Sequence, residues 1–189
     1  MNKIRKLFFV FGLLCIFSSF ILCLYFYINI HLSIQENEKN VHELYNRMPS
    51  IENGILLDDS DEMPMVEINQ ENFVGIIEIP RFNRILPVGG IWNKNLLKYP
   101  LVYKGSIYDR SLIIGGSDSK KQFDFMTQIN EKDKVFFIDM KGKRFSYEIE
   151  KIEITKDISN LNSSEYDLII FVKNTYSFDY TILKCNYKL

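Results

Sequence analysis

The chain has few of the side chains that metal centres, disulfide frameworks and acid–base catalysis require. Only three cysteines and two histidines occur among its 189 residues. Cys15 and Cys23 lie in an apolar N-terminal run and Cys185 lies near the C-terminal end, so we expect no intrachain disulfide and no zinc site. His31 and His42 are the only histidines, so the rest of the chain lacks the usual general base.

The chain also has no large excess of positive or negative charge, because its formal net charge is −1 at pH 7. No basic stripe interleaved with aromatic residues occurs, which excludes the usual nucleic-acid-binding pattern. We therefore expect no nucleic-acid partner, and nothing in the sequence implies a cofactor or a metal. Aromatic residues are by contrast abundant, at 14% of the chain, which favours a β-rich core.

A long uncharged apolar run spans residues 7–30. A helix needs roughly 20 apolar residues to cross a bilayer, so this run predicts a transmembrane segment. Lys3, Arg5 and Lys6 precede it, which predicts a cytoplasmic tail over residues 1–6 and a C-terminal domain outside the cell membrane. A cleaved signal peptide is the alternative, but residues 25–28 are bulky rather than small, which favours an uncleaved anchor.

Residues 31–70 predict a juxtamembrane helix followed by an acidic linker. The apolar side chains between residues 31 and 48 recur at helical spacing: Ile34, Val41, Leu44, Tyr45 and Met48. Such a helix is either a free stalk or packs on its own domain, and the pattern does not decide between the two. Residues 58–62 carry four carboxylates without the glycine and terminal glutamate of a calcium loop, which favours a solvated linker.

Short apolar runs separated by turn residues begin near residue 71. They cover residues 73–79, 84–88, 101–103, 112–114, 134–140, 144–154 and two runs between residues 166 and 185. Residues 141–143, Lys-Gly-Lys, predict a hairpin turn, and residues 123–129 predict a short helix. We therefore predict a mainly β domain over residues 71–189, a closed barrel of seven to eight strands with one or two short helices, rather than a sandwich.

Several motifs in this domain resemble those of the sortase family, and they occur in the family's order. Residues 72–80, NFVGIIEIP, are similar to the G-x-I-x-I-P first strand, and residues 86–90, LPVGG, to the following L-P-V-Y-x-G. Residues 111–117, SLIIGGS, resemble the strand that ends in Gly-His. Phe123 and Met126 match F-x-x-L, residues 132–139 resemble the G-D turn and its strand, and residues 144–150 resemble Y-x-Y-x-V. Residues 166–185 resemble the C-terminal strand pair that carries the nucleophile.

The resemblance implies a membrane-anchored cysteine transpeptidase, which cleaves a sorting signal and transfers its acyl group to an amine. That chemistry needs a thiolate, a histidine and an arginine. At the matching positions this sequence has Lys173 for the cysteine, Ser117 for the histidine and Tyr180 for the arginine. The resemblance therefore implies a sortase-like barrel that has lost the family's catalytic groups.

Three hypotheses follow. The first is a catalytically inactive protein that binds a sorting-signal peptide, a pilin or a partner sortase in a groove lined by Ser117, Lys173 and Tyr180. The second is an active transpeptidase that uses Ser117 and a desolvated Lys173 as an acyl-transfer pair. The third is a structural exported protein. Cys185 is expected in the core or at an edge, and residues 58–65 are weakly similar to the lid of some pilin-linked sortases.

Overall fold

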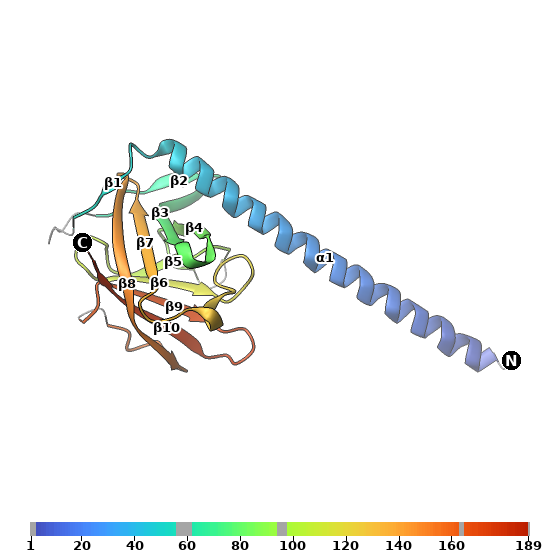
Figure 1. Cartoon of the computed structure of the whole chain (residues 1–189). Helices are drawn as coiled ribbons and strands as arrows, with labels where there is room; N and C mark the ends of the chain where they lie inside the picture. The colour runs from blue at the N-terminus through green and yellow to red at the C-terminus, as the bar shows by residue number, and fades with distance from the viewer. Residues whose placement is uncertain (1–2, 56–61, 94–97, 163–164, 189) are drawn as a thin grey trace.

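One long helix and one barrel make up the structure (Figure 1). The computed structural model describes residues 3–55, 62–93, 98–162 and 165–188. Helix α1 (Lys3–Arg47) includes both the apolar run and the predicted juxtamembrane helix, with no break between them. It is the one helix in the described part of the chain that is long and apolar enough to cross a membrane, with a mean hydropathy of 2.7 over its most apolar window. A signal sequence would have the same properties.

The barrel is closed by eight strands in the described residues. They are β3 (Glu71–Ile79), β4 (Arg84–Gly89), β5 (Leu101–Lys104), β6 (Leu112–Ser117), β7 (Lys134–Asp139), β8 (Lys143–Thr155), β9 (Leu168–Lys173) and β10 (Tyr180–Tyr187). Their order around the barrel is β3-β4-β5-β6-β9-β10-β8-β7, and β7 pairs with β3 to complete the ring. The β4–β5 and β6–β9 pairs are parallel and the others are antiparallel. This confirms the predicted closed barrel.

Two short 3-10 helices and a tight hairpin turn connect strands of the barrel. The 3-10 helices η1 (Pro80–Phe82) and η2 (Met126–Gln128) follow β3 and β6. The helix expected over residues 123–129 is thus a single 3-10 turn preceded by turns. The Lys-Gly-Lys segment forms the predicted hairpin turn, in which Gly142 has a φ of +75°, a conformation that glycine adopts without strain.

Alternating side chains of the strands fill the barrel interior. Along β9, Leu168, Ile170 and Val172 belong to the interior cluster, whereas Ile169 and Phe171 belong to a cluster on the outer face. This alternation is the two-residue period of a strand. It means that the outer face of the sheet is apolar as well, so something must cover it.

Helix α1 covers one part of that outer face. A bulge in β3 places Phe73 and Ile76 outside the barrel and Val74 and Ile77 inside, which explains why this strand is apolar without alternation. The outside residues pack against the C-terminal part of α1 in a second cluster, the helix cluster, whose buried members are Val41, Leu44, Met48, Ile68, Phe73, Ile76, Tyr99, Leu101, Ile138 and Met140. The juxtamembrane helix therefore packs on its own domain.

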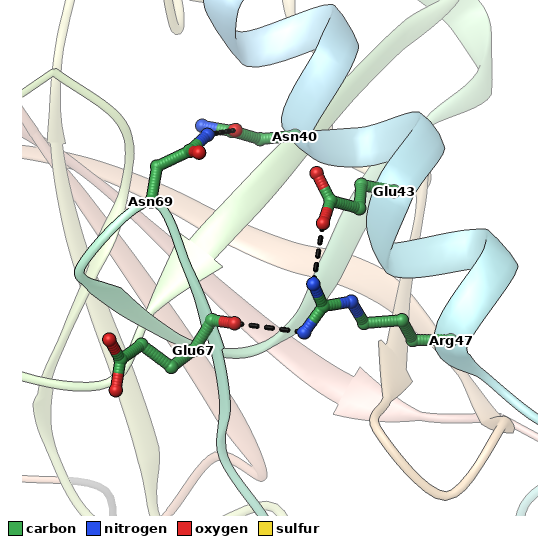
Figure 2. A network of polar contacts seen from close by, with 5 residues as sticks. All are labelled: Asn40, Glu43, Arg47, Glu67 and Asn69. Atoms are coloured by element: carbon green, nitrogen blue, oxygen red, sulfur yellow. Dashed lines mark hydrogen bonds and ion pairs between the residues drawn. The ribbon is translucent and has the colours of Figure 1, made fainter.

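Polar contacts fix the same helix end. Figure 2 shows Arg47 donating to the Glu67 carbonyl oxygen at 2.9 Å and pairing with Glu43 at 2.5 Å, with Asn69 and Asn40 beside them. A further bond runs from the hydroxyl of Tyr45 to Glu78 in β3 at 2.6 Å. Burial and this bond to Glu78 raise the pKa of Tyr45. These contacts hold α1 in one orientation on the barrel.

The region expected to be a linker is partly sheet. Strand β1 (Glu52–Asn53) pairs with β8, and β2 (Val66–Ile68) pairs with β3. Both are short edge additions, and Ile68 is buried in the helix cluster. The sequence did not predict them because two- and three-residue strands have no periodic pattern of their own. The acidic residues 58–61 lie outside the described residues.

Candidate functional site

The three residues at the matching catalytic positions lie in one row across neighbouring strands. Ser117 in β6 is the register partner of Lys173 in β9, and Lys173 is the partner of Tyr180 in β10. Register partners point to the same face of a sheet, and here that is the outer face, because the alternate residues Val172 and Thr181 face the other way. The sheet thus brings together residues that are 56 and 7 positions apart in the sequence.

A pocket of about 480 Å³ lies along this outer face beside the row. We call it the outer groove, and it is lined by Trp92, Tyr103, Gly116, Asp157, Ile158, Ser159, Phe171, Lys173 and Tyr180. Lys173 and Tyr180 line it directly, whereas Ser117 lies next to the lining residue Gly116. Four of the lining side chains are aromatic, which suits binding of an apolar or extended ligand.

The Phe171 ring packs edge to face with Tyr103 and Tyr180 and is tilted at 57° to Trp92. The Phe171 ring lies 5.6 Å from Trp92, 5.2 Å from Tyr103 and 6.0 Å from Tyr180, measured between ring centroids. Trp92 also packs against the helix cluster, so one side chain joins the two outer clusters. Gly115 is required beneath them, because a Cβ there would lie 2.4 Å from Phe171 and 2.5 Å from Trp92.

The charges around the groove are arranged at its edges. The side chain of Lys173 is exposed, and within the described residues it forms no ion pair. Asp157 accepts hydrogen bonds from the backbone and hydroxyl of Ser159, at 2.9 and 2.7 Å, and these lower the pKa of its carboxyl. The groove therefore has one cationic and one anionic side chain, Lys173 and Asp157, among its lining residues, together with four aromatic rings.

Ser117 and Lys173 are neighbours in register, and the hydrogen bonds found for Ser117 within the described residues go to other partners. The Ser117 hydroxyl lies 3.0 Å from that of Ser119, and its backbone N–H donates to Gln122 at 2.9 Å. A lysine base needs a desolvated amine, whereas the Lys173 side chain is exposed. Tyr180 is half-buried and supplies a hydroxyl rather than a fixed positive charge.

Cys185 lies in the barrel interior, as expected for a core residue. It is fully buried among the interior cluster, and burial raises the pKa of its thiol. Because the thiolate is the reactive form, burial disfavours this cysteine as a nucleophile.

We expect Cys185 in a Cys15→Ala, Cys23→Ala chain to resist alkylation at pH 8, the thiolate being suppressed. Iodoacetamide should label the folded chain at least roughly 100-fold more slowly than the denatured chain. This ratio corresponds to a free energy of about 2.8 kcal/mol for the local opening that exposes the buried thiol. Mass spectrometry against time measures both rates. Equal rates would place the thiol at the surface and contradict the core assignment.

The sequence did not reveal the aromatic lining. Trp92 and Tyr103 lie on a loop and a strand far from residues 171–180 in the chain, and only the tertiary structure brings them together. The one available signal was Trp92 itself, the single tryptophan of the chain, two positions after the Gly89-Gly90 pair.

Comparisons with known proteins agree on the fold. No family model matches the sequence, and no curated protein matches it. Solved structures do match. Sortase A from Corynebacterium diphtheriae has 12% identity over 85% of this chain and 84% of that chain, with a TM-score of 0.54. A Clostridium perfringens sortase D5 transpeptidase has 14% identity over 62% and 79%, with a TM-score of 0.53. A pilus-related sortase C of Group B Streptococcus has 14% identity over 69% and 77%, with a TM-score of 0.54.

Proposed function

Because the chain has a sortase-like fold, we propose that it is a membrane-anchored, extracytoplasmic peptide-binding protein that does not carry out the family's acyl transfer. Its ligand is an extended segment of the sorting-signal type, carried by a surface protein, a pilin or a partner sortase. The observation that carries this proposal is the row Ser117–Lys173–Tyr180 beside an aromatic groove. The groove beside the row could accept an extended peptide, and the row itself lacks a thiol, an imidazole and a guanidinium.

The groove supports binding because four of its lining side chains are aromatic and pack on one another. Phe171 is almost fully buried and forms the base on which Trp92, Tyr103 and Tyr180 pack. Rigid aromatic side chains contribute large contact areas at little cost in conformational entropy.

The absence of a working nucleophile supports binding over turnover. Ser117 is engaged with Ser119 and Lys173 is exposed, while Cys185 is inside the barrel. An acyl transfer needs a nucleophile and a base in contact, and also a donor for the oxyanion. None of the residues in the row supplies the first two in this arrangement.

The anchor is supported by α1. Residues 7–30 are uncharged and 0% of the most apolar window is buried in the structure, so a bilayer is the environment that would cover them. Lys3, Arg5 and Lys6 precede the run and favour a cytoplasmic N-terminus. With one span, the barrel is then outside the cytoplasmic membrane.

Trp92 makes the proposal directly measurable, since it is the only tryptophan and lines the groove. Synthetic sorting-signal peptides titrated into the full chain in detergent micelles are expected to change tryptophan emission in a saturable way. Intact mass measured on the same samples is expected to show no covalent adduct.

An adduct on any side chain would overturn the proposal. Loss of that adduct in both Ser117→Ala and Lys173→Met would then favour the alternative function, an active transpeptidase. Unchanged tryptophan emission with every peptide, in a chain that remains folded by circular dichroism, would remove peptide binding as the function of the groove.

A further inference from the structure

The loop between β9 and β10, residues 174–179, carries two of the most exposed large side chains of the barrel. Tyr176 is 93% exposed and Phe178 is 75% exposed. Ile154, which is 70% exposed at the end of β8, lines the same surface pocket as Tyr176. We call these three residues the loop patch. Isolated apolar side chains are common on protein surfaces, but two exposed aromatics two positions apart on one short loop, with an isoleucine, are a candidate contact surface.

The loop holds these rings outward on a fixed backbone. The Asn174 N–H donates to the Asp179 carbonyl oxygen at 2.9 Å, which closes the loop, and Asn174 and Ser177 side chains both donate to the Asp179 carboxylate. Phe178 has a φ of +58°, a left-handed conformation that is unfavourable for a bulky residue. Phe178 therefore occupies a backbone conformation that asparagine or glycine would adopt at lower energy.

A series of hydrogen bonds shows which part of α1 lies beside this loop. Thr175 donates to Asp118 through its backbone at 2.9 Å and also through its hydroxyl. Three residues beyond Asp118, the Lys121 carbonyl oxygen accepts a hydrogen bond from Asn37 of α1 at 3.3 Å. The end of the barrel that carries the loop patch thus lies beside residue 37 of the helix, and not beside its C-terminal end at Arg47.

Residue 37 is close to the apolar run. It lies seven positions after Ile30, and at 1.5 Å per residue this is about 10 Å along the helix axis. The polar headgroup layer on each side of a bilayer is roughly 5–8 Å thick. Figure 1 shows the β9–β10 loop on the side of the barrel toward which the N-terminal part of α1 runs. Side chains that protrude from this end therefore reach the headgroup layer.

The charges of the loop do not oppose such a contact. The carboxylates of Asp118 and Asp179 accept hydrogen bonds from within the loop, and Asp124 pairs with Arg84 at 2.6 Å. The lysines around the loop, Lys120, Lys156 and Lys173, are exposed. Lysines near an anionic lipid surface are attracted to it, whereas the aromatic rings act on any bilayer.

We propose that the loop patch inserts into the headgroup region of the bilayer that holds α1, as a second membrane contact of the barrel. The inference rests on the membrane anchor of the proposed function and is independent of peptide binding. The docked helix sets the height of the barrel, and Tyr176 and Phe178 supply the interfacial aromatic contact. The membrane then limits both the tilt and the rotation of the barrel.

The test uses the full chain in nanodiscs with a fluorescent probe on one introduced cysteine. In a Cys15→Ala, Cys23→Ala background, Tyr176→Cys carries the probe at the loop patch. Ile51→Cys, an exposed apolar position beyond the far end of α1, carries it in the matched control. Lipids brominated at a shallow acyl position quench probes that enter the interface.

We expect emission at position 176 to fall roughly two-fold or more and emission at 51 to be unchanged, because interfacial groups are buried ~5–10 Å into the headgroup–acyl boundary. Quenching should persist in zwitterionic lipid. Adding Phe178→Asn, whose side chain tolerates the left-handed backbone, should weaken the quenching at 176 without unfolding the loop.

Absence of quenching at 176 in a chain that resists alkaline carbonate extraction would overturn the loop contact and leave the anchor intact. Release of the chain by carbonate would remove the anchor, and with it the loop contact. Protection of the probe only after a second protein is added would assign the patch to a protein partner and also overturn the proposal.

Discussion

Deleting residues 1–48 is expected to destabilise the barrel severely, whereas deleting residues 1–30 is expected to leave it folded. The difference is residues 31–48, in which Val41, Leu44 and Met48 are buried against the outer face of the sheet. Full burial of such side chains contributes roughly 1.5–3 kcal/mol each. Their loss therefore removes about 5–9 kcal/mol, which is comparable with the whole stability of about 5–15 kcal/mol of a typical domain.

Urea unfolding of the two soluble fragments measures the effect. Fragment 31–189 should unfold in one cooperative transition, and fragment 49–189 should be largely unfolded or bind hydrophobic dyes without urea. Equal transition midpoints would show that the helix is a free stalk and that the helix cluster contributes little.

A single substitution tests the same packing within one chain. Leu44 is 0% exposed, so Leu44→Ala in fragment 31–189 should lower the free energy of unfolding by about 2–5 kcal/mol. Leu32 is the matched control in the same helix, because it is 57% exposed and its change to alanine should cost less than about 0.5 kcal/mol. Similar costs for the two leucines would contradict the docking of α1.

Tyr180→Ala is expected to weaken peptide binding by roughly 30-fold, the factor that corresponds to a loss of about 2 kcal/mol for an aromatic anchor at a binding site. The ring lines the outer groove and packs edge to face on Phe171, so its removal opens the groove to water at the end nearest Lys173. The emission of the native Trp92 reports binding in this variant and in the unaltered chain, because the substitution leaves Trp92 in place.

Tyr176→Ala is the control for this measurement. It removes the same residue type from the adjoining loop, but Tyr176 is 93% exposed and does not line the outer groove. In detergent micelles its dissociation constant for the peptide should match that of the unaltered chain. A loss at Tyr176 as large as that at Tyr180 would mean that the peptide binds over the loop, and would contradict the site.

Local pattern was enough for much of the fold. Short apolar runs between turn residues marked the barrel strands, Lys-Gly-Lys marked the β7–β8 turn, and the uncharged run marked the N-terminal part of α1. These features depend on residues close together in the chain, which is why a single sequence reveals them. The identity of the residues at positions 117, 173 and 180 was likewise readable, since it needs only the order of the strands.

The amino-acid sequence by itself determined the strand pattern, the apolar run and the identity of the side chains at positions 117, 173 and 180. Only the tertiary structure decided that α1 packs on the barrel, that Trp92 and Tyr103 join Phe171 in a groove, and that Asp118 connects the loop patch to the helix side. The physical reason is that these contacts join residues far apart in sequence. Periodicity shows which side chains are buried, but not which distant side chain covers them.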